Sequence, residues 1–155
     1  NDLRIDESII LRGIKNIIKN TNLIGRWQIV GNKPTVVFDI AHNFNSLELV
    51  FEQLNSNKGK IRVVFGTLDK LDQLNCLKIF SKNHKYYFCS PNIKRAMPLS
   101  KLCAKAKKLN INFSAHSSVK AAYENAITES DENDMILVTG STYLFSEIKN
   151  FHSSY

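Results

Sequence analysis

The feature that most constrains the fold of this chain is a regular alternation between short apolar segments and stretches of helical spacing. Five segments rich in β-branched and aromatic residues are each followed by a stretch whose apolar residues recur at helical intervals. The five segments are residues 35–38, 61–66, 86–89, 111–113 and 135–138. Such alternation is typical of a mostly parallel sheet with helices on both faces, joined by right-handed crossovers. The sequence therefore predicts an α/β domain.

The predicted helices each have an apolar face, and several have a recognisable start. Asn45 or Ser46 can cap a helix that ends near residue 54, and Ser117 or Ser118 can cap one over residues 119–128. Pro98 suits the start of another helix. A further helix is expected to end near residue 81, and a last one to carry residues 143–151. The residues expected to face the core are Leu47, Val50, Phe51, Leu54, Leu99, Leu102, Ala106, Leu109, Tyr143, Leu144, Ile148 and Phe151.

Residues 26–46 predict a hairpin that adds a sixth strand. Two strand-like segments, 27–30 and 35–38, are separated by the turn-forming residues glycine, asparagine and proline. If Val30 and Thr35 close the loop, antiparallel pairing places Arg26 opposite Asp39. The fold expected is thus a Rossmann-like sheet of six strands, parallel except for an antiparallel strand at one edge.

Residues 5–19 predict an amphipathic helix ahead of the hairpin. Its isoleucines recur at helical spacing, and acidic residues near its start with lysines near its end suit the helix dipole. Two interpretations are open. Residues 1–22 can be a linker helix that packs against an upstream domain, or the first helix of the core. The chain begins with polar residues and no methionine, so we expect it to be a piece of a longer protein.

Four polar or glycine-containing loops are expected to share one edge of the sheet, because parallel strands point their carboxyl ends the same way. They are residues 39–43, 66–70, 90–92 and 139–141. Two of them lead into helix N-termini, which suit anions. A ligand site is expected at this edge.

The composition narrows the classes of partner. The net charge is +7, from 21 Lys and Arg against 14 Asp and Glu. Such a balance suits an ordinary soluble surface or small anionic ligands, and no nucleic-acid-binding motif accompanies the lysines. No apolar run approaches the about 20 residues of a membrane span. Cys76, Cys89 and Cys103 lie in apolar surroundings without paired spacing, so we expect reduced core cysteines in a cytoplasmic protein.

The motif D-I-A-H-N at residues 39–43, with G-R at residues 25–26, resembles the C-terminal domain of folylpolyglutamate synthases and dihydrofolate synthases. These enzymes belong to the Mur-ligase superfamily. Later motifs occur in the family's order: D-K at 69–70, R-A at 95–96 and G-S-T-Y-L at 140–144. The resemblance covers residues 23–151, so a Mur-ligase-type C-terminal domain is expected over residues 23–155. Phe44 replaces the family's proline, and Leu71 stands where another Asp is usual.

The resemblance implies an ATP-dependent ligase that adds L-glutamate to folate and, if bifunctional, also to dihydropteroate. In this superfamily ATP converts a substrate carboxylate into an acyl phosphate, which an amine attacks to form the amide. The phosphate-binding motif G-x-x-x-x-G-K-[ST] does not occur in this chain. The resemblance implies that this loop, the Mg²⁺ ligands and most of the folate pocket belong to an N-terminal ATPase domain. The piece alone is expected to be inactive and to bind ATP weakly at best.

The resemblance also implies roles for five residues. Arg26 would contact phosphate oxygens of ATP, which a planar fork of donors suits, and Asp39 its ribose hydroxyls. His42 and Ser141 would be catalytic and would handle the incoming glutamate, with Asn43 beside them; no metal ligand is expected. Each also has a simpler interpretation: a surface ion pair for Arg26 and Asp39, a capping or packing role for His42, and a helix N-cap for Ser141.

A different class of function is a stand-alone α/β binding module or a receiver-like regulatory module. Asp39 and Asp69 at strand ends would suit a receiver fold, which uses acidic residues to hold a metal. A receiver also needs a close acidic pair early in the chain, whereas Asp6 and Glu7 lie on the first predicted helix. The G-S-T-Y-L motif favours the ligase.

Overall fold

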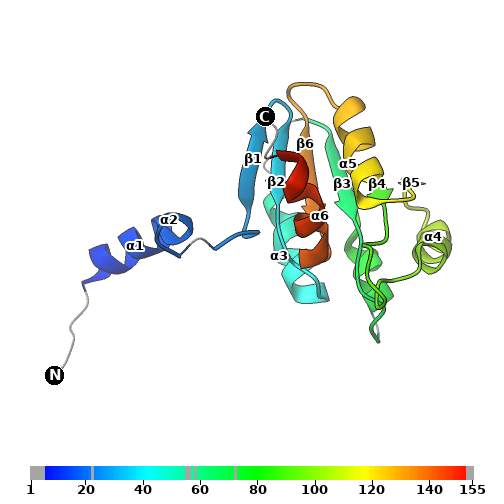
Figure 1. The fold of residues 1–155 in the computed structure, drawn as a ribbon, viewed down its shortest axis with the longest axis horizontal. Helices are drawn as coiled ribbons and strands as arrows, with labels where there is room; N and C mark the ends of the chain where they lie inside the picture. Colours follow the sequence, from blue (N-terminus) through cyan, green and yellow to red (C-terminus); the bar gives the residue numbers. More distant parts are fainter. Residues whose placement is uncertain (1–5, 22, 55–56, 58, 72, 153–155) are drawn as a thin grey trace.

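The protein is built on a six-stranded sheet with the order β1-β2-β6-β3-β4-β5 (Figure 1). The computed structural model describes residues 6–21, 23–54, 57, 59–71 and 73–152. All neighbouring strands are parallel except β1 with β2. The predicted sheet, mostly parallel with an antiparallel edge strand, is confirmed. The strands are β1 (Gln28–Asn32), β2 (Thr35–Phe38), β3 (Ile61–Phe65), β4 (Lys85–Phe88), β5 (Phe113–Ala115) and β6 (Met135–Thr139).

Helices cover both faces of the sheet (Figure 1). One layer holds α3 (Phe44–Leu54), the 3-10 helix η1 (Gln73–Ile79) and α4 (Leu99–Lys108), and the other holds α5 (Val119–Thr128) and α6 (Thr142–His152). Strand side chains alternate between the layers: in β3, Val63 and Phe65 pack into the first and Val64 into the second. Burial on both faces explains why the parallel strands are nearly continuous apolar runs.

The apolar faces predicted for the helices are largely confirmed. In α3 all four predicted residues are buried. In α4, Leu102 and Ala106 are buried, and Leu99 and Leu109 pack against the same cluster. In α6, Leu144 and Ile148 are buried, Tyr143 lines the pocket described below, and the side chain of Phe151 lies outside the described residues.

The predicted register of the hairpin is wrong. β1 continues through Gly31 and Asn32, and Asn32 rather than Val30 pairs with Thr35. The register shifts between Ile29 and Gly31, so a bulge absorbs the extra residue. Glycine inside a strand favours such a bulge. The same glycine was a turn signal in the sequence, which is why the turn was predicted too early.

The predicted N-terminal helix over residues 5–19 is divided into α1 (Glu7–Lys15) and α2 (Ile17–Thr21). At the break, the side-chain amide of Asn16 donates to the Arg12 carbonyl at 2.8 Å, which competes with helical bonding. No residue of α1 is buried, and Figure 1 shows α1 and α2 away from the sheet. α1 is therefore no core helix of the described domain, and its role as a linker stays a prediction.

β5 begins at Phe113, two residues later than the predicted strand, because the preceding residues end α4. Asn110 takes a left-handed φ of 53°, and the Ile111 amide donates to the Ala106 carbonyl at 3.1 Å. This is the bonding of a helix C-cap. Ile111 is buried as part of that cap, so its apolar character was mistaken for a strand signal.

The starts of two helices test the predicted caps. Ser118 caps α5 as predicted, with its hydroxyl accepting from the Ala121 amide at 3.1 Å. α3 starts earlier than predicted, at Phe44, so its cap is Asn43 rather than Asn45 or Ser46. The helix predicted to end near residue 81 is the 3-10 helix η1. Its buried residues are Gln73, Cys76 and Leu77, and the spacing of three between Gln73 and Cys76 is that of a 3-10 turn.

Candidate functional site

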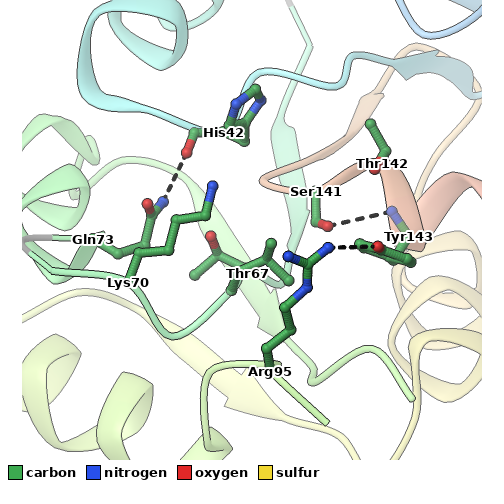
Figure 2. A pocket seen from close by; sticks show the side chains of 9 residues that line it. His42, Thr67, Lys70, Gln73, Arg95, Ser141, Thr142 and Tyr143 are labelled. Carbon is green, nitrogen blue, oxygen red and sulfur yellow. Dashed lines mark hydrogen bonds between the residues drawn. The ribbon is translucent and has the colours of Figure 1, made fainter. Parts of the chain in front are cut away.

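A pocket of about 210 Å³ lies at the carboxyl edge of the parallel strands. Its walls come from the segments that follow β2, β3, β4 and β6, the edge predicted for a ligand. The volume is below the about 300–1,000 Å³ typical of larger ligand sites, so it suits a molecule the size of an amino acid. The lining residues, shown in Figure 2, are His42, Thr67, Leu68, Lys70, Gln73, Arg95, Ser141, Thr142 and Tyr143.

Asp39 fixes the segment that carries His42. Asp39 is 8% exposed, and its carboxylate accepts hydrogen bonds from the backbone amides of Trp27 and Ala41, both at 2.8 Å. These bonds join the end of β2 to the residue before β1. Hydrogen bonds from two backbone amides to a charged acceptor are strong. They therefore fix the backbone conformation of the segment that leads to His42.

The same segment is joined to the end of β6. The Ala41 carbonyl accepts hydrogen bonds from the Gly140 amide at 2.9 Å and from the Thr139 hydroxyl at 3.3 Å. Gly140 has a φ of +105°, and a Cβ there would lie 2.6 Å from the Gly66 carbonyl oxygen. Only glycine fits this crossing. It brings His42 and Ser141 to one pocket, which the sequence predicted from their motifs.

His42 is exposed and has a defined ring orientation. Its Nδ1 lies 3.0 Å from the Ile40 carbonyl, which can only accept, so Nδ1 carries the proton of this bond. In the neutral ring Nε2 then keeps its lone pair and can accept a proton. The His42 carbonyl accepts from the side-chain amide of Gln73 at 3.0 Å, and Gln73 is buried. The segment after β3 thus holds the His42 segment in place.

Ser141 lies at the N-terminus of α6. Its hydroxyl accepts from the Tyr143 amide at 3.2 Å, so the simpler interpretation of Ser141 as an N-cap is confirmed. Ser141 is 5% exposed but still lines the pocket. A serine hydroxyl that accepts one bond keeps its proton to donate. Ser141 can therefore cap the helix and contact a ligand at the same time.

Two cations that were not among the predicted site residues line the pocket. Lys70 follows β3 and Arg95 follows β4. The neighbouring acid, Asp69, is already paired with Lys101 on α4 at 2.7 Å. None of the lining residues is acidic, so the pocket has a positive character that suits an anion. The D-K and R-A motifs marked these positions in the sequence without assigning them a role.

Arg26 and Asp39 lie at the same end of the hairpin but do not pair. The predicted side-chain pairing is wrong, because none of the ion pairs among the described residues includes Arg26. Asp39 instead uses its carboxylate on backbone amides, one of them the amide of Trp27 next to Arg26. Neither residue lines the pocket. Arg26 is exposed and its guanidinium is available to a ligand beyond the pocket.

Asn43 has a structural role at the start of α3. Its side-chain oxygen accepts from the Ser46 amide at 2.9 Å, and the Ser46 hydroxyl donates to the Asn43 carbonyl at 3.1 Å. Asn43 is therefore the N-cap of α3. Its predicted contact with substrate stays a prediction. Phe44, where the family has proline, is the first residue of α3, a position at which proline is well tolerated.

The cysteines are free thiols rather than members of the site. Burial raises the pKa of the Cys89 thiol, and burial also raises the pKa of Cys76. A thiol kept protonated is a poor nucleophile and metal ligand. In the part of the chain that the structure describes, no group of three or more His, Cys, Asp and Glu side chains could hold a metal ion. No helix there is long and apolar enough to cross a membrane.

The family model for the Mur ligase glutamate ligase domain matches residues 25–142, which include the D-I-A-H-N motif and the start of α6. The chain belongs to this family. Among curated relatives, the dihydrofolate synthase/folylpolyglutamate synthase of Buchnera aphidicola subsp. Schizaphis graminum is 31% identical over 143 residues. That match takes in 88% of this chain and 33% of the relative. The Escherichia coli enzyme of the same name is 26% identical over 148 residues, which cover 94% of this chain and 33% of the relative.

Solved structures agree with the fold of this Mur ligase domain. Escherichia coli FolC in complex with DHPP and ADP has a TM-score of 0.79 and 25% identity, covering 99% of this chain and 36% of that one. The bifunctional folylpolyglutamate synthase/dihydrofolate synthase of Yersinia pestis has a TM-score of 0.80 and 25% identity, covering 97% and 36%. The chain therefore spans about a third of the length of these relatives. The match with this ligase family displaces the receiver-like alternative.

Proposed function

We propose that this Mur ligase domain is the C-terminal part of an ATP-dependent ligase that adds L-glutamate to folate or dihydropteroate. The observation that carries the proposal is the pocket shared by His42 and Ser141, which has a positive lining and the size of an amino acid. The names of the relatives support the same reaction, and the C-terminal position agrees with the third of their length that the chain spans.

In this proposal the pocket receives the incoming L-glutamate. Lys70 and the amide groups at the N-terminus of α6 suit a carboxylate. The lone pair on Nε2 of His42 suits the ammonium group, which must lose a proton before its nitrogen can attack an acyl carbon. The Ser141 hydroxyl donates a hydrogen bond to the bound glutamate. Asn43 supports His42 by fixing the start of α3, and we retain it as a candidate substrate contact.

ATP fits the residues next to the pocket. The exposed Arg26 guanidinium suits phosphate oxygens, and the Asp39 carboxylate oxygens each keep acceptor capacity for a ribose hydroxyl. A solved relative has Mn, AMPPNP and L-glutamate bound, which supports a nucleotide and a divalent metal. We propose Mg²⁺ as the metal, held by an upstream ATPase domain. ATP would supply the phosphoryl group that activates the acyl carboxylate.

We further propose that the upstream domain covers the exposed isoleucines of α1 and that the enzyme is cytoplasmic. Ile9, Ile10 and Ile14 are each about half exposed or more. An amphipathic helix with an unburied apolar face gains stability from a packing partner. Residues 1–22 would then connect the two domains, and residues 23–155 would form the C-terminal one.

The test joins this chain to the upstream two-thirds of the Escherichia coli relative and measures phosphate release with dihydropteroate, L-glutamate and ATP. We expect turnover by the fusion, and a loss of about 10²-fold or more in kcat/KM for His42→Ala and Ser141→Ala. Ser100→Ala, an exposed position on α4 outside the pocket, serves as the control. Full activity in both pocket variants would refute the assignment.

The isolated chain provides the complementary measurement. It lacks the phosphate-binding motif, so we expect no ATP hydrolysis by the 155-residue chain. Hydrolysis that is abolished by Arg26→Ala would overturn this expectation.

A further inference from the structure

Arg95 lines the pocket. Its backbone is fixed by hydrogen bonds to a neighbouring segment, whereas its side chain makes few contacts. The Arg95 carbonyl accepts from the Asp69 amide at 2.9 Å, and the next residue, Ala96, bridges to Leu68. The segments after β3 and β4 are thereby joined. The guanidinium donates one hydrogen bond, to the Tyr143 hydroxyl at 2.9 Å, and its carbon lies 5.9 Å from the centre of that ring.

The remaining donors of Arg95 have no acceptor within the described residues. A guanidinium carries five N–H groups in a planar fork that matches a carboxylate. Two acids on neighbouring elements are engaged elsewhere. Asp69 pairs with Lys101, and the Glu147 carboxylate accepts from the Asn92 amide at 2.8 Å. The charge of Arg95 therefore faces a pocket whose lining contains no acid.

We propose that Arg95 binds a carboxylate of the ligand and that Tyr143 holds the Arg95 guanidinium in place beside the pocket. Because Lys70 suits one carboxylate, the ligand must carry a second carboxylate for Arg95. In Figure 2, Lys70 and Arg95 extend into the pocket from either side of Thr67. Two cations in one small pocket match a dicarboxylate better than a ligand with one acidic group. The Tyr143 hydroxyl and ring orient the guanidinium, which reduces the rotamer freedom lost when a ligand binds.

This inference rests on the proposed function, in which two sources can supply the carboxylate. One is the incoming L-glutamate, and the other is the γ-glutamyl tail of a folate that already carries glutamate residues. Both present the same group to Arg95. The experiment therefore needs one arm that measures binding of the group itself and another that separates the two sources.

The first arm measures binding to the 155-residue chain by NMR of arginine side chains, with L-glutamate, γ-glutamyl-glutamate and L-glutamine as probes. We expect L-glutamate, with two carboxylates, and γ-glutamyl-glutamate, with three, to shift the Arg95 signals, and glutamine, which has a single carboxylate, to bind more weakly. Arg95→Gln should weaken the binding of L-glutamate and of γ-glutamyl-glutamate about 10- to 100-fold, the range of a charge-assisted hydrogen bond. Arg95→Lys should retain part of the affinity, and Tyr143→Phe should reduce it less than Arg95→Gln.

Lys94→Gln is the matched control, because it removes the same charge from the adjacent exposed residue, which does not line the pocket. It should bind like the wild type. Arg95 is exposed, so Arg95→Gln should also keep the wild-type melting temperature. A wild-type chain that binds neither L-glutamate nor γ-glutamyl-glutamate would overturn the proposal, as would an Arg95→Gln chain that binds them with unchanged affinity.

The second arm uses the fusion enzyme and compares KM values. A rise confined to the KM for L-glutamate assigns Arg95 to the incoming amino acid, and a rise that grows with tail length assigns it to the γ-glutamyl tail. Unchanged values for both substrates in an active Arg95→Gln fusion would refute the role of Arg95 while leaving the proposed reaction intact. An inactive wild-type fusion whose domain still binds dicarboxylates through Arg95 would count against the proposed reaction alone.

Discussion

At the scale of single residues, Asp39 anchors the segment that leads to His42, and its carboxylate can also accept a hydrogen bond from a ligand. It is nearly buried, and each carboxylate oxygen accepts one backbone amide, from Trp27 or from Ala41. Each oxygen also keeps capacity for a second donor. A predicted ribose contact is therefore compatible with the anchoring role. An activity loss in an Asp39 variant has to be separated from a loss of stability.

Asp39→Ala should lower the free energy of unfolding by about 2–4 kcal/mol, because a buried and a part-buried amide lose their acceptor. Urea denaturation followed by circular dichroism measures the change. Asp131→Ala, whose side chain is 80% exposed, should change it by no more than about 0.5 kcal/mol. Equal stability of the two variants would show that Asp39 does not anchor the loop.

A buried ion pair lies at the opposite end of the sheet from the pocket. Arg62 of β3 pairs with Asp134, the residue before β6, and also donates to the Glu129 carbonyl at the end of α5. Burial alone would raise the pKa of the Asp134 carboxyl, but bonds from the Asp131 amide, Arg62 and the Lys60 amide lower that pKa overall. The pair therefore connects two strands and a helix.

Asp134→Asn should lower the free energy of unfolding by about 3–5 kcal/mol, because it leaves the Arg62 charge buried without its partner. The matched control is Glu132→Gln, which breaks the exposed pair with Lys33 and should cost at most about 1 kcal/mol. Thermal and urea unfolding measure both changes. A cost for Asp134→Asn no larger than that for Glu132→Gln would contradict the assignment.

At the scale of elements, the start of α3 explains why the chain tolerates its departure from the family motif. Phe44 is the first residue of the helix, a position where the backbone amide needs no helical partner. Proline and phenylalanine are therefore both compatible with the fold. Asn43 provides the cap in either case.

Phe44→Pro should change the free energy of unfolding by less than about 1 kcal/mol, because proline suits the first position of a helix. Leu49→Pro, at an exposed position inside the same helix, should cost about 3 kcal/mol or more. Urea denaturation of the two variants measures the contrast. A large loss in Phe44→Pro would contradict this expectation and would show that the Phe44 side chain, 38% exposed, contributes to the packing of the domain.

The elements also show which parts of the fold sequence reasoning can reach. Periodicity identified the sheet and the helix faces, because buried parallel strands and amphipathic helices have strong apolar patterns. It misplaced the turn of the hairpin and the start of β5. The bulge before Gly31 and the cap at Asn110 both involve residues whose signals suit more than one structure. Local signals do not decide between a turn and a bulge when both use glycine.

At the scale of the whole molecule, the site was predicted in part for a similar reason. The sequence predicted that His42 and Ser141 lie at the same edge of the sheet, because each follows a parallel strand and each belongs to a family motif. The structure confirms that both line one pocket. The pairing of Arg26 with Asp39 failed because it assumed a perfect hairpin. Gln73 and Arg95 were missed as pocket residues, because their positions depend on how η1 and the segment after β4 pack. The R-A motif was a visible signal for Arg95.

The stability of the folded domain should fall as the pH is lowered, in two stages. Burial lowers the pKa of His84 and of His116 below the ordinary 6.5, so the unfolded chain takes up protons that the folded chain resists. Hydrogen bonds, the largest from Lys85, lower the pKa of Glu129 from 4.5, and the network described above lowers that of Asp134 from 3.8. Every one of these shifts favours folding at higher pH.

We expect a first loss of stability below pH 6.5 and a second below pH 4.5, each beginning at the unfolded-state pKa and ending below the folded-state pKa. Urea unfolding at intervals from pH 8 to about pH 2 measures both stages of the profile. His84→Gln combined with His116→Gln should flatten the first stage and leave the second. If the free energy of unfolding increased as the pH was lowered from 7.5 to 5.5, the lowered pKa values of His84 and His116 would be contradicted.

The separation of the Arg62–Asp134 pair from the pocket has an evolutionary consequence. The buried ion pair lies at the amino end of the strands, and the residues that line the pocket lie at the carboxyl end. Substitutions that change which ligand the pocket prefers need not weaken the Arg62–Asp134 pair at the other end of the strands. A domain arranged in this way can evolve a pocket for a different ligand while the buried ion pair that stabilises its fold stays unchanged.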